Sequence, residues 1–400
     1  MAQYPMTLGD DVVQHLFVGD GGVARLLEQV LNQVLQAQEA VQAAPYERTT
    51  ERRGYRNGTV DRPLTTRVGT LTLRVPRLRD GSFSPELFAR YQRHEQAFVL
   101  ARLEMVINGV STRKVTKITE ELCGTEVSKS AVSALCQQLD PVVTAWRTRS
   151  WADTPYPFLL VDALVLRIRE DGHGRPRAGC VVMGVNAAGQ REILGFWVGD
   201  SESEAHWRTV CQDLKARGLH GVDLVVSDQH AGLVRALQRE FQGTTWQRCQ
   251  THFSRNVLDA CPKALHDPLH AAVRAVFEAP DRRRADWLSQ PLITDFQETA
   301  PKAVAIWEAG VEDALAILAY PAEVRLRLRT ANDLERLNRE IRRRERVIRI
   351  VPHRASAERL LGAGRMEVHE GWSTGRRYVN LETYWAERGS AAAEEPAVTA

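Results

Sequence analysis

Hydrophobic residues between positions 158 and 249 fall into short apolar runs separated by amphipathic segments. The runs predict three strands joined by tight connections, at 158–169, 179–187 and 191–198. Helices and strands are then expected to alternate, at 202–217, 223–228, 231–241 and 244–249. Three hairpin-linked strands followed by such an alternation are the chain order of a ribonuclease-H-like fold. We therefore predict an α/β domain with a mixed five-stranded sheet.

The alternation stops near residue 255, where a long helical pattern begins. Residues 255–325 are almost entirely helical in pattern, and prolines separate the successive segments. We interpret this stretch as an all-α insertion. The chain then resumes with an arginine-rich helix, "NDLERLNREIRRRERVIRI". Residues 325–349 contain ten arginines and four acids, a balance that favours a phosphate-binding surface over an ordinary solvated face.

Residues 21–43 have the spacing of a strong amphipathic helix. Six apolar residues recur on one side of it, namely Leu26, Leu27, Val30, Leu31, Val34 and Leu35. Such a stripe either packs on its own domain or forms a dimer interface, and the sequence leaves both interpretations open. The helix is therefore a candidate for dimerisation.

Residues 46–80 change character, because nine arginines accompany four acids and no lysine. Glycines and prolines interrupt short β-type runs such as "TLTLRV". The guanidinium group binds phosphate in a bidentate manner. We therefore predict a DNA-binding segment that includes Arg52, Arg53 and Arg56. A solvated basic hairpin without a partner is the alternative.

Residues 109–140 have the pattern of a helix–turn–helix. Gly124 lies where the first helix should end, and Ser128 can cap the second helix. In the DNA-binding form of this motif, the second helix enters the major groove. Arg113 and Lys129 are therefore candidate DNA contacts, although many helical hairpins of this kind contact no DNA.

The composition is that of a soluble globular protein: of 400 residues, 44% are hydrophobic and 26% are charged. The formal net charge is only +3, so the clustering of arginines is more informative than the total. No apolar run approaches the ~20 residues that span a bilayer, and no signal peptide is expected. Six widely spaced cysteines without a CxxC pair indicate a reduced, cytoplasmic protein.

The first predicted strand of the α/β domain carries a carboxylate in its middle. Asp162 interrupts "FLLVDALVLRI" and shares a face with the alternating residues Leu160 and Leu164. An ionised carboxylate on an apolar face is costly unless it is paired, hydrogen-bonded or bound to a metal. The alternatives are a local turn towards solvent or a pairing arginine.

Two further acids follow, and each has a structural alternative. Asp228 ends the strand "DLVVSD", at the edge of the sheet where sites form, but it can also cap the next helix. Glu335 lies in the first turn of the arginine-rich helix, on the same stripe as Arg339 and Arg342. With Asn332 as the N-cap, Glu335 would instead complete a capping box.

Three carboxylates on adjacent strands and a crossing helix can converge on Mg²⁺ or Mn²⁺, because such hard cations bind a few carboxylates together with water and phosphate. Two ions would suit phosphodiester chemistry. Cys249 and His252 have CxxH spacing, but a structural zinc site needs four ligands and no second pair is evident in the sequence. No zinc is therefore expected, and a packed cysteine with a hydrogen-bonded histidine beside the active site is the preferred interpretation.

These features together resemble the Mutator-type bacterial insertion-sequence transposases of the DDE class. The matching runs stand in the family's order from about residue 10 to 385: "YERTTERRGYRNG", "VPRLRDGSF", "GVSTRKV", "VDALVLRIRE", "GDSESEAHW", "LVVSDQHAGL", "WQRCQTHFSRN" and "LERLNREIRRR". The resemblance implies a ribonuclease-H-like catalytic domain with a helical insertion. It also implies that Asp162, Asp228 and Glu335 are the DDE residues, and that Cys249 and His252 are the family's CxxH motif in a supporting role.

The sequence departs from the family pattern in two places. The family usually has an aliphatic residue before the catalytic Glu, whereas this chain has Asp333 in "TANDLERLN". The family also has a Gly-Ile-Phe-Pro run after the arginine-rich helix, where this chain has "IRIVPHRAS". Neither change removes a member of the triad, so an active enzyme is expected.

We therefore predict a transposase that binds the terminal inverted repeats of an insertion sequence. Water activated by metal at the triad would free a 3′-OH, and that 3′-OH would attack another phosphodiester. A homodimer is expected because two ends are processed together, and Arg339, Arg342 and Arg343 would hold DNA. The alternatives are a metal-dependent nuclease of the same fold without strand transfer, and a domesticated DNA-binding regulator.

The predicted division of the chain places a mainly helical DNA-binding region before the catalytic domain. Its segments are an N-terminal helical segment at 1–45, a basic segment at 46–105, a helix–turn–helix at 106–150, the catalytic domain at 151–385 with its insertion at about 255–325, and a disordered tail at 386–400.

Overall fold

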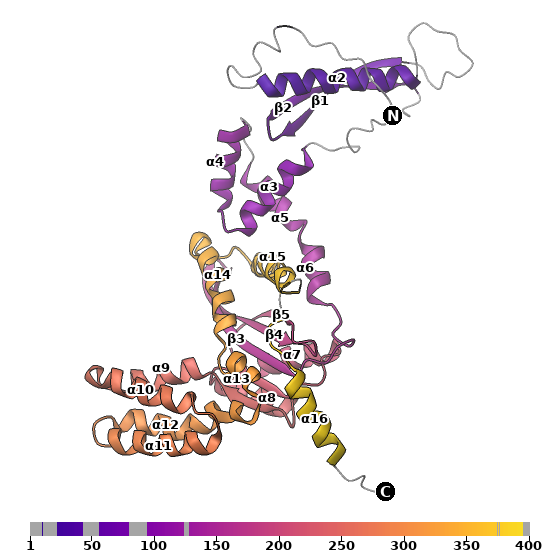
Figure 1. Ribbon diagram of the computed structural model, residues 1–400. Helices are drawn as coiled ribbons and strands as arrows, with labels where there is room; N and C mark the ends of the chain where they lie inside the picture. Colours follow the sequence, from indigo (N-terminus) through magenta and orange to yellow (C-terminus); the bar gives the residue numbers. More distant parts are fainter. Residues whose placement is uncertain are drawn as a thin grey trace. The chain divides into compact units, whose positions relative to one another are not determined.

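The computed structural model describes residues 10, 22–42, 56–79, 94–123, 128–373, 375 and 377–394 (Figure 1). By its internal contacts the chain forms two compact units, Met1–Gln138 and Leu139–Ala400. The finer division expected from the sequence stays a prediction.

The predicted amphipathic helix of the first unit packs on a β-hairpin. Helix α2 (Gly22–Gln42) covers strand β2 (Gly69–Leu78), which pairs antiparallel with β1 (Arg56–Thr66). Their shared core consists of Leu35, Leu64, Leu71 and Leu73. Helix side chains also satisfy the free edge of β2, because the Thr72 N–H donates to Glu28 at 2.8 Å and the Arg74 N–H donates to Asn32 at 2.7 Å. This packing favours the interpretation that the helix packs on its own domain.

Three further helices complete the described part of the first unit: α3 (Gln96–Ile107), α4 (Thr112–Cys123) and α5 (Lys129–Gln137). They pack around Phe98, Val115, Val132 and Cys136. Ser128 caps α5 as predicted, since its hydroxyl accepts the Ala131 N–H at 3.1 Å. Gly124 lies outside the described residues. The two predicted helices are present, whereas a DNA-binding helix–turn–helix stays a prediction.

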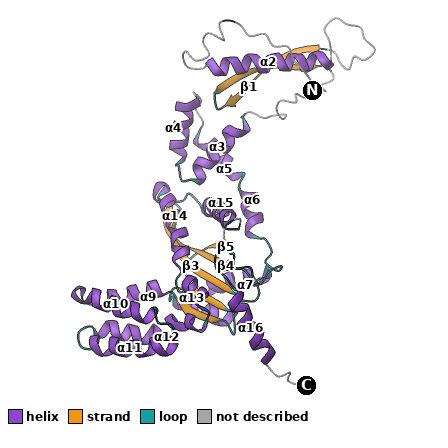
Figure 2. Ribbon diagram, in the orientation of Figure 1, coloured by secondary structure: helices purple, strands orange, loops and turns teal. Residues whose placement is uncertain are grey.

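A mixed five-stranded sheet forms the centre of the second unit, in the order β5-β4-β3-β6-β7 (Figure 2). Its strands are β3 (Phe158–Glu170), β4 (His173–Val185), β5 (Arg191–Gly199), β6 (Leu224–Ser227) and β7 (Thr245–Arg248). The first three strands pair antiparallel, β6 runs parallel to β3, and β7 runs parallel to β6. The strand number and the mixed sheet agree with the prediction.

Helices cover both faces of this sheet, because strand side chains alternate between two apolar clusters. Leu159 and Val161 pack with α7 (Glu204–Ala216) and α8 (Ala231–Glu240). Leu160 and Leu164 belong to the opposite cluster. That second face is covered by α6 (Asp140–Arg147), α13 (Ala322–Leu328), α14 (Asn332–Ile348) and α15 (Arg354–Ser373).

The predicted helical insertion is present and has a core of its own. Its helices are α9 (Gln250–Asp259), α10 (His266–Phe277), α11 (Arg282–Phe296) and α12 (Pro301–Leu315), with short 3₁₀ turns at Lys263–Leu265 and Ala316–Ala319. Phe253 stacks on Trp307 with ring centroids 5.5 Å apart. The Gln247 and Gln250 amides both donate to the Ala314 carbonyl, which ties the end of α12 back to β7. Figure 1 shows the four helices lying side by side.

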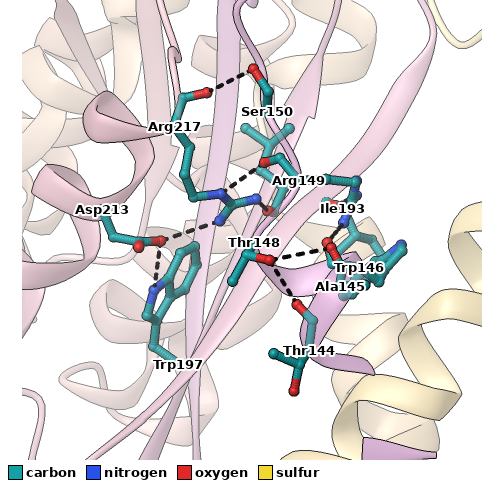
Figure 3. A network of polar contacts seen from close by, with 11 residues as sticks. Thr144, Ala145, Trp146, Thr148, Arg149, Ser150, Ile193, Trp197, Asp213 and Arg217 are labelled. Atoms are coloured by element: carbon teal, nitrogen blue, oxygen red, sulfur yellow. Dashed lines mark hydrogen bonds and ion pairs between the residues drawn. The ribbon is translucent and has the colours of Figure 1, made fainter. Parts of the chain in front are cut away.

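The segment that leads from α6 into β3 is held on the sheet by the Arg217 guanidinium, which contacts the Arg149 backbone (Figure 3). The Arg217 guanidinium donates to the Arg149 carbonyl at 3.0 Å and to Asp213 at 3.2 Å. Trp197 donates to the same Asp213 carboxylate at 3.1 Å. These contacts anchor the entry to β3, and so fix the strand that carries Asp162.

The C-terminal stretch of the described residues is helical. Helix α16 (Glu382–Glu394) extends well into the stretch 386–400 that was expected to be disordered. Alanine has the highest intrinsic helix propensity, so the run "SAAAE" at 390–394 can continue a helix even though its composition is simple. Among the described residues, no helix is long and apolar enough to cross a membrane.

Candidate active site

The three predicted carboxylates come from three elements of the second unit. Asp162 lies within β3, Asp228 follows β6 directly, and Glu335 lies near the start of α14. Because Leu160 pairs with Val226 in the parallel β3–β6 register, two more residues along each strand bring Asp162 and Asp228 to the same level. The topology therefore brings together residues that are far apart in the sequence.

Hydrogen bonds to both carboxylate oxygens stabilise Asp162 on the apolar face of β3. Its Oδ2 accepts from the Asn338 amide at 2.7 Å, and its Oδ1 accepts from the Ala163 N–H at 2.8 Å. Burial, together with the negative charge of Asp228, raises the pKa of Asp162 to about 6 despite these hydrogen bonds. β3 pairs continuously with β4 through Asp162, so the carboxylate is not turned to solvent by a bulge.

Asp228 and Glu335 lie on opposite sides of the His252 ring. His252 Nδ1 is 2.5 Å from Asp228 Oδ1, and His252 Nε2 is 2.8 Å from Glu335 Oε1. Asp228 at hydrogen-bonding distance, and to a smaller extent Cys249, raise the pKa of His252 to about 10. The imidazolium cation therefore compensates two carboxylates at neutral pH.

Neither helix-capping alternative occurs. The residue before α8 is His230, with no side-chain capping bond, so Asp228 does not cap that helix. The residue before α14 is Ala331, and Asn332 lies inside the helix, so Glu335 does not complete a capping box. Asp333 is turned to Arg191, with 3.2 Å between the charged groups, and its proximity in sequence does not make it a competitor for Glu335.

Cys249 joins the two chain segments that carry Asp228 and Glu335. Its N–H donates to the Ser227 carbonyl at 2.8 Å, and its Sγ accepts the Ala331 N–H at 3.3 Å. Ser227 precedes Asp228 and Ala331 precedes α14, so the cysteine holds the end of β6 beside the start of α14. The cysteine is packed, as expected, and His252 lies between two carboxylates, whereas the supporting role of both residues stays a prediction.

The donor set fits a hard divalent cation. Asp228 Oδ1 and Glu335 Oε1 are buried and, among the described residues, face the His252 ring without an aligned hydrogen bond. Carboxylate oxygens are the ligands that Mg²⁺ and Mn²⁺ prefer. A second set is also close: ligand atoms of Asp228, Cys249 and His252 lie within 4.8 Å of one another. These are three ligands rather than the four of a structural zinc site.

The candidate DNA contacts fall in different places. Arg339, Arg342 and Arg343 are exposed on α14, and Arg113 and Lys129 are exposed at the starts of α4 and α5. Arg52 and Arg53 lie outside the described residues, and Arg56 is described only as the first residue of β1.

The α14 arginines line a groove of about 1000 Å³ between α14 and α15. Six arginines and two acids line it, together with apolar residues that include Trp372. The Arg191 guanidinium lies 4.2 Å from the centre of the Trp372 ring. Sequence reasoning missed Arg191 and Trp372, which lie in segments without a recognisable motif. It also missed Asn338, which lies within the run "LERLNREIRRR" but was not singled out there.

The chain has clear relatives among known proteins. A family model described as "Transposase, Mutator family" matches residues 6–375. The transposase for insertion sequence element IS256 in transposon Tn4001 of Staphylococcus aureus is 43% identical over 390 residues, which are 96% of this chain and 100% of that relative. The transposase for insertion sequence element ISRM5 of Rhizobium meliloti (strain 1021) is 41% identical over 90% of this chain and 91% of that relative. The Drosophila P element transposase strand transfer complex is 9% identical over 79% of this chain and 89% of that one, with a TM-score of 0.30, which is too low to establish a common fold.

Proposed function

Because the chain belongs to the Mutator family of transposases, we propose that it cuts and joins DNA at the ends of an insertion sequence through Asp162, Asp228 and Glu335. One observation carries this proposal. His252 bridges Asp228 and Glu335, and the charges of Asp228 and His252 both act on Asp162, so three acids from distant segments share one electrostatic site. Structural ion pairs do not require three acids around one base, whereas metal-dependent phosphodiester chemistry uses clustered carboxylates to hold its cations.

The topology supports a ribonuclease-H-like catalytic domain. Three antiparallel strands, followed by two parallel strands on the other side of β3, give the order β5-β4-β3-β6-β7. The helical insertion leaves the sheet after β7 and returns before α14, between Asp228 and Glu335. The central strand β3, the end of β6 and the start of α14 are rigid elements, and they are suitable places for groups that must be held to fractions of an ångström.

The carboxylates would act as ligands and not as proton carriers. Asp162, Asp228 and Glu335 would hold Mg²⁺ or Mn²⁺, with two ions expected, and the bound cations would supply the Lewis acidity that phosphodiester cleavage needs. Cys249 and His252 keep Asp228 and Glu335 beside each other. In the reaction, hydrolysis of one phosphodiester frees a 3′-OH, and that hydroxyl then attacks a target phosphodiester and displaces a new 3′-OH.

DNA binding would be divided between the two units. The candidate arginines Arg339, Arg342 and Arg343 follow Glu335 along α14, starting about one turn beyond it, so they would hold the backbone next to the cleaved bond. The hairpin β1–β2 and the helices α4 and α5, as a helix–turn–helix, would read the terminal inverted repeats. A homodimer would bring two element ends together. Since the apolar face of α2 already packs on its own hairpin, another surface would carry much of that contact.

Strand transfer separates this function from that of a nuclease. The substrate is the DNA that brackets the reading frame, supplied both as uncut ends and as pre-cleaved ends, together with a supercoiled target plasmid and Mg²⁺. We expect joined products in which the end's 3′-OH is linked to the plasmid. Cleavage of uncut ends without any joined product would favour a nuclease, and DNA binding with neither reaction would favour a DNA-binding regulator.

A further inference from the structure

A buried arginine lies behind the candidate catalytic carboxylate of β3. Arg365 of α15 has 0% relative exposure, and its Nε and Nη1 have no hydrogen-bond partner among the described residues. Its Nη2 lies 3.5 Å from the Asn338 Oδ1. Burial lowers the pKa of Arg365 to about 9, and the nearby charge of Asp162 opposes that shift. The guanidinium is therefore a cation at neutral pH.

Asn338 connects this cation to Asp162. The residue is 3% exposed, and its Nδ2 donates to Asp162 Oδ2 at 2.7 Å. A guanidinium can only donate hydrogen bonds, so it keeps the amide oxygen of Asn338 on its own side. The amide NH₂ must then face Asp162. In this way Arg365 determines which end of the amide meets the carboxylate.

We infer that Arg365 and Asn338 are a positioning pair, in which Arg365 orients the Asn338 amide and the amide orients the Asp162 carboxylate for metal binding. The inference rests on the proposed function of Asp162. Groups that hydrogen-bond to metal ligands fix the orientation of those ligands and strengthen metal binding. With Oδ2 held by Asn338 and Oδ1 by Ala163, the remaining lone pairs of Asp162 keep one direction.

A neighbouring arginine on the same helix shows what a purely structural role looks like. Arg359 is also buried, at 8% exposure, and it binds Asp140 through two direct hydrogen bonds of 2.6 and 2.7 Å. That pair joins α15 to α6. Within the part of the chain that the structure describes, Arg365 has no such bidentate partner and leaves two donor atoms unpaired, which costs stability. Since an apolar residue could pack against Phe196 without that cost, the cation points to a role at Asp162.

The experiment measures Mn²⁺ binding to the full-length protein by isothermal titration calorimetry, without DNA. Asn338→Ala should weaken Mn²⁺ binding about 10-fold or more, in the range found for other partners of metal ligands. Arg365→Met should change it in the same direction. The double variant should be no more than about twofold weaker than Asn338→Ala, because Arg365 acts through the amide. Arg359→Met is the matched control, and it should lower Tm while leaving Mn²⁺ affinity unchanged.

The inference is overturned if folded Asn338→Ala and Arg365→Met bind Mn²⁺ within twofold of the parent protein. It is also overturned if the effects of the two substitutions simply add. Asp162→Asn serves as a separate arm, measured by cleavage. If Asp162→Asn still cleaves, the proposed function of Asp162 fails, whereas loss of cleavage together with unchanged Mn²⁺ affinity in the other variants removes only the positioning pair.

Discussion

The carboxylate cluster (Asp162, Asp228 and Glu335) and the arginine ridge (Arg339, Arg342 and Arg343) meet on one helix but are held in opposite ways. The Glu335 side chain is 25% exposed and faces His252, whereas the Arg343 side chain is 56% exposed and pairs with Glu340 on its own helix. Groups that act on one bond must be fixed from several directions. Groups that hold a polyanion need charge and reach. Substitutions in the cluster should therefore abolish chemistry, and substitutions in the ridge should change affinity by degrees.

The largest effect is expected for Glu335→Gln. The amide has nearly the same shape but cannot replace an anionic ligand, and losing several kcal/mol of metal-dependent stabilisation corresponds to about 10³-fold slower cleavage. DNA affinity should stay the same or rise slightly. Single-turnover cleavage and a mobility-shift titration in one buffer check both quantities.

Glu345→Gln is the control for that substitution, because it makes the same change on the same helix. Glu345 accepts the Arg167 N–H at 3.0 Å and lies outside the carboxylate cluster. An amide oxygen can accept the same hydrogen bond, so cleavage by this variant should remain within about threefold of the parent protein. Equal losses in the two variants would show that the cluster has no special role.

The second-largest effect is expected for His252→Gln, and the loss of thermal stability in this variant should depend on pH. The folded-state pKa of His252 is raised from 6.5 to about 10, so its contribution to stability is fully present below pH ~6.5 and is lost as the pH rises through about 10. The Tm of the variant should fall below that of the parent at pH 6.5, and the difference should shrink towards pH 10. Mg²⁺ should also shrink it, because a bound cation compensates the same carboxylates.

His266→Gln tests whether that behaviour belongs to the site. The His266 ring contacts the Cys261 carbonyl within the insertion, at 3.1 Å. Its effect on Tm should not respond to Mg²⁺. If thermal unfolding shows the same Mg²⁺ response in both variants, His252 does not replace a metal charge. Metal analysis of the purified protein is informative as well, since stoichiometric zinc would contradict the expectation that Asp228, Cys249 and His252 hold none.

The sequence predicts the carboxylate cluster better than it predicts the groups that support it. Strands and helices of the second unit follow from local alternation and from turn residues, and their order suffices to bring Asp162 and Asp228 to neighbouring strands. Excluding helix capping required the structure, because a capping residue and a metal ligand use the same residue types. Arg365 had no local signal, since its partners lie on β3 and α14 and meet it only after folding.

The run Arg342–Arg343–Arg344 illustrates the same limit within the ridge. Composition treats the three residues as one basic patch, yet Arg344 is 5% exposed while the two before it are exposed. Helical spacing contains the missing information: Leu337, Ile341 and Arg344 follow at i, i+4 and i+7, so Arg344 continues the apolar stripe. Asn338 could be found similarly, three residues after Glu335 and on the side of α14 that faces the sheet.

A partial loss of DNA affinity is expected for the double variant Arg342→Gln/Arg343→Gln. If each residue contacts one phosphate, the slope of log affinity against log salt should fall by about 0.9 per lost contact, and affinity at physiological salt should fall about 10-fold. Cleavage at saturating protein should be unchanged. The pair Arg283→Gln/Arg284→Gln on α11 makes the same change in net charge. An equal loss of affinity in this control would mean that total charge, and not the ridge, binds DNA.

The smallest effect is expected for Arg344→Met, which replaces the buried arginine that follows the exposed arginines of the ridge. The Arg344 guanidinium lies 3.3 Å from Glu340 and 3.6 Å from Glu367, and both acids are largely solvated, so these ion pairs contribute little. Methionine removes a buried charge and fills similar space, and stability should change by no more than about 1 kcal/mol in thermal unfolding. The salt slope of DNA binding should stay at the parent value. If Arg344→Met instead lowers the slope as the double variant Arg342→Gln/Arg343→Gln does, exposure is not what selects the DNA-binding arginines, and the contrast between the carboxylate cluster and the exposed ridge is lost.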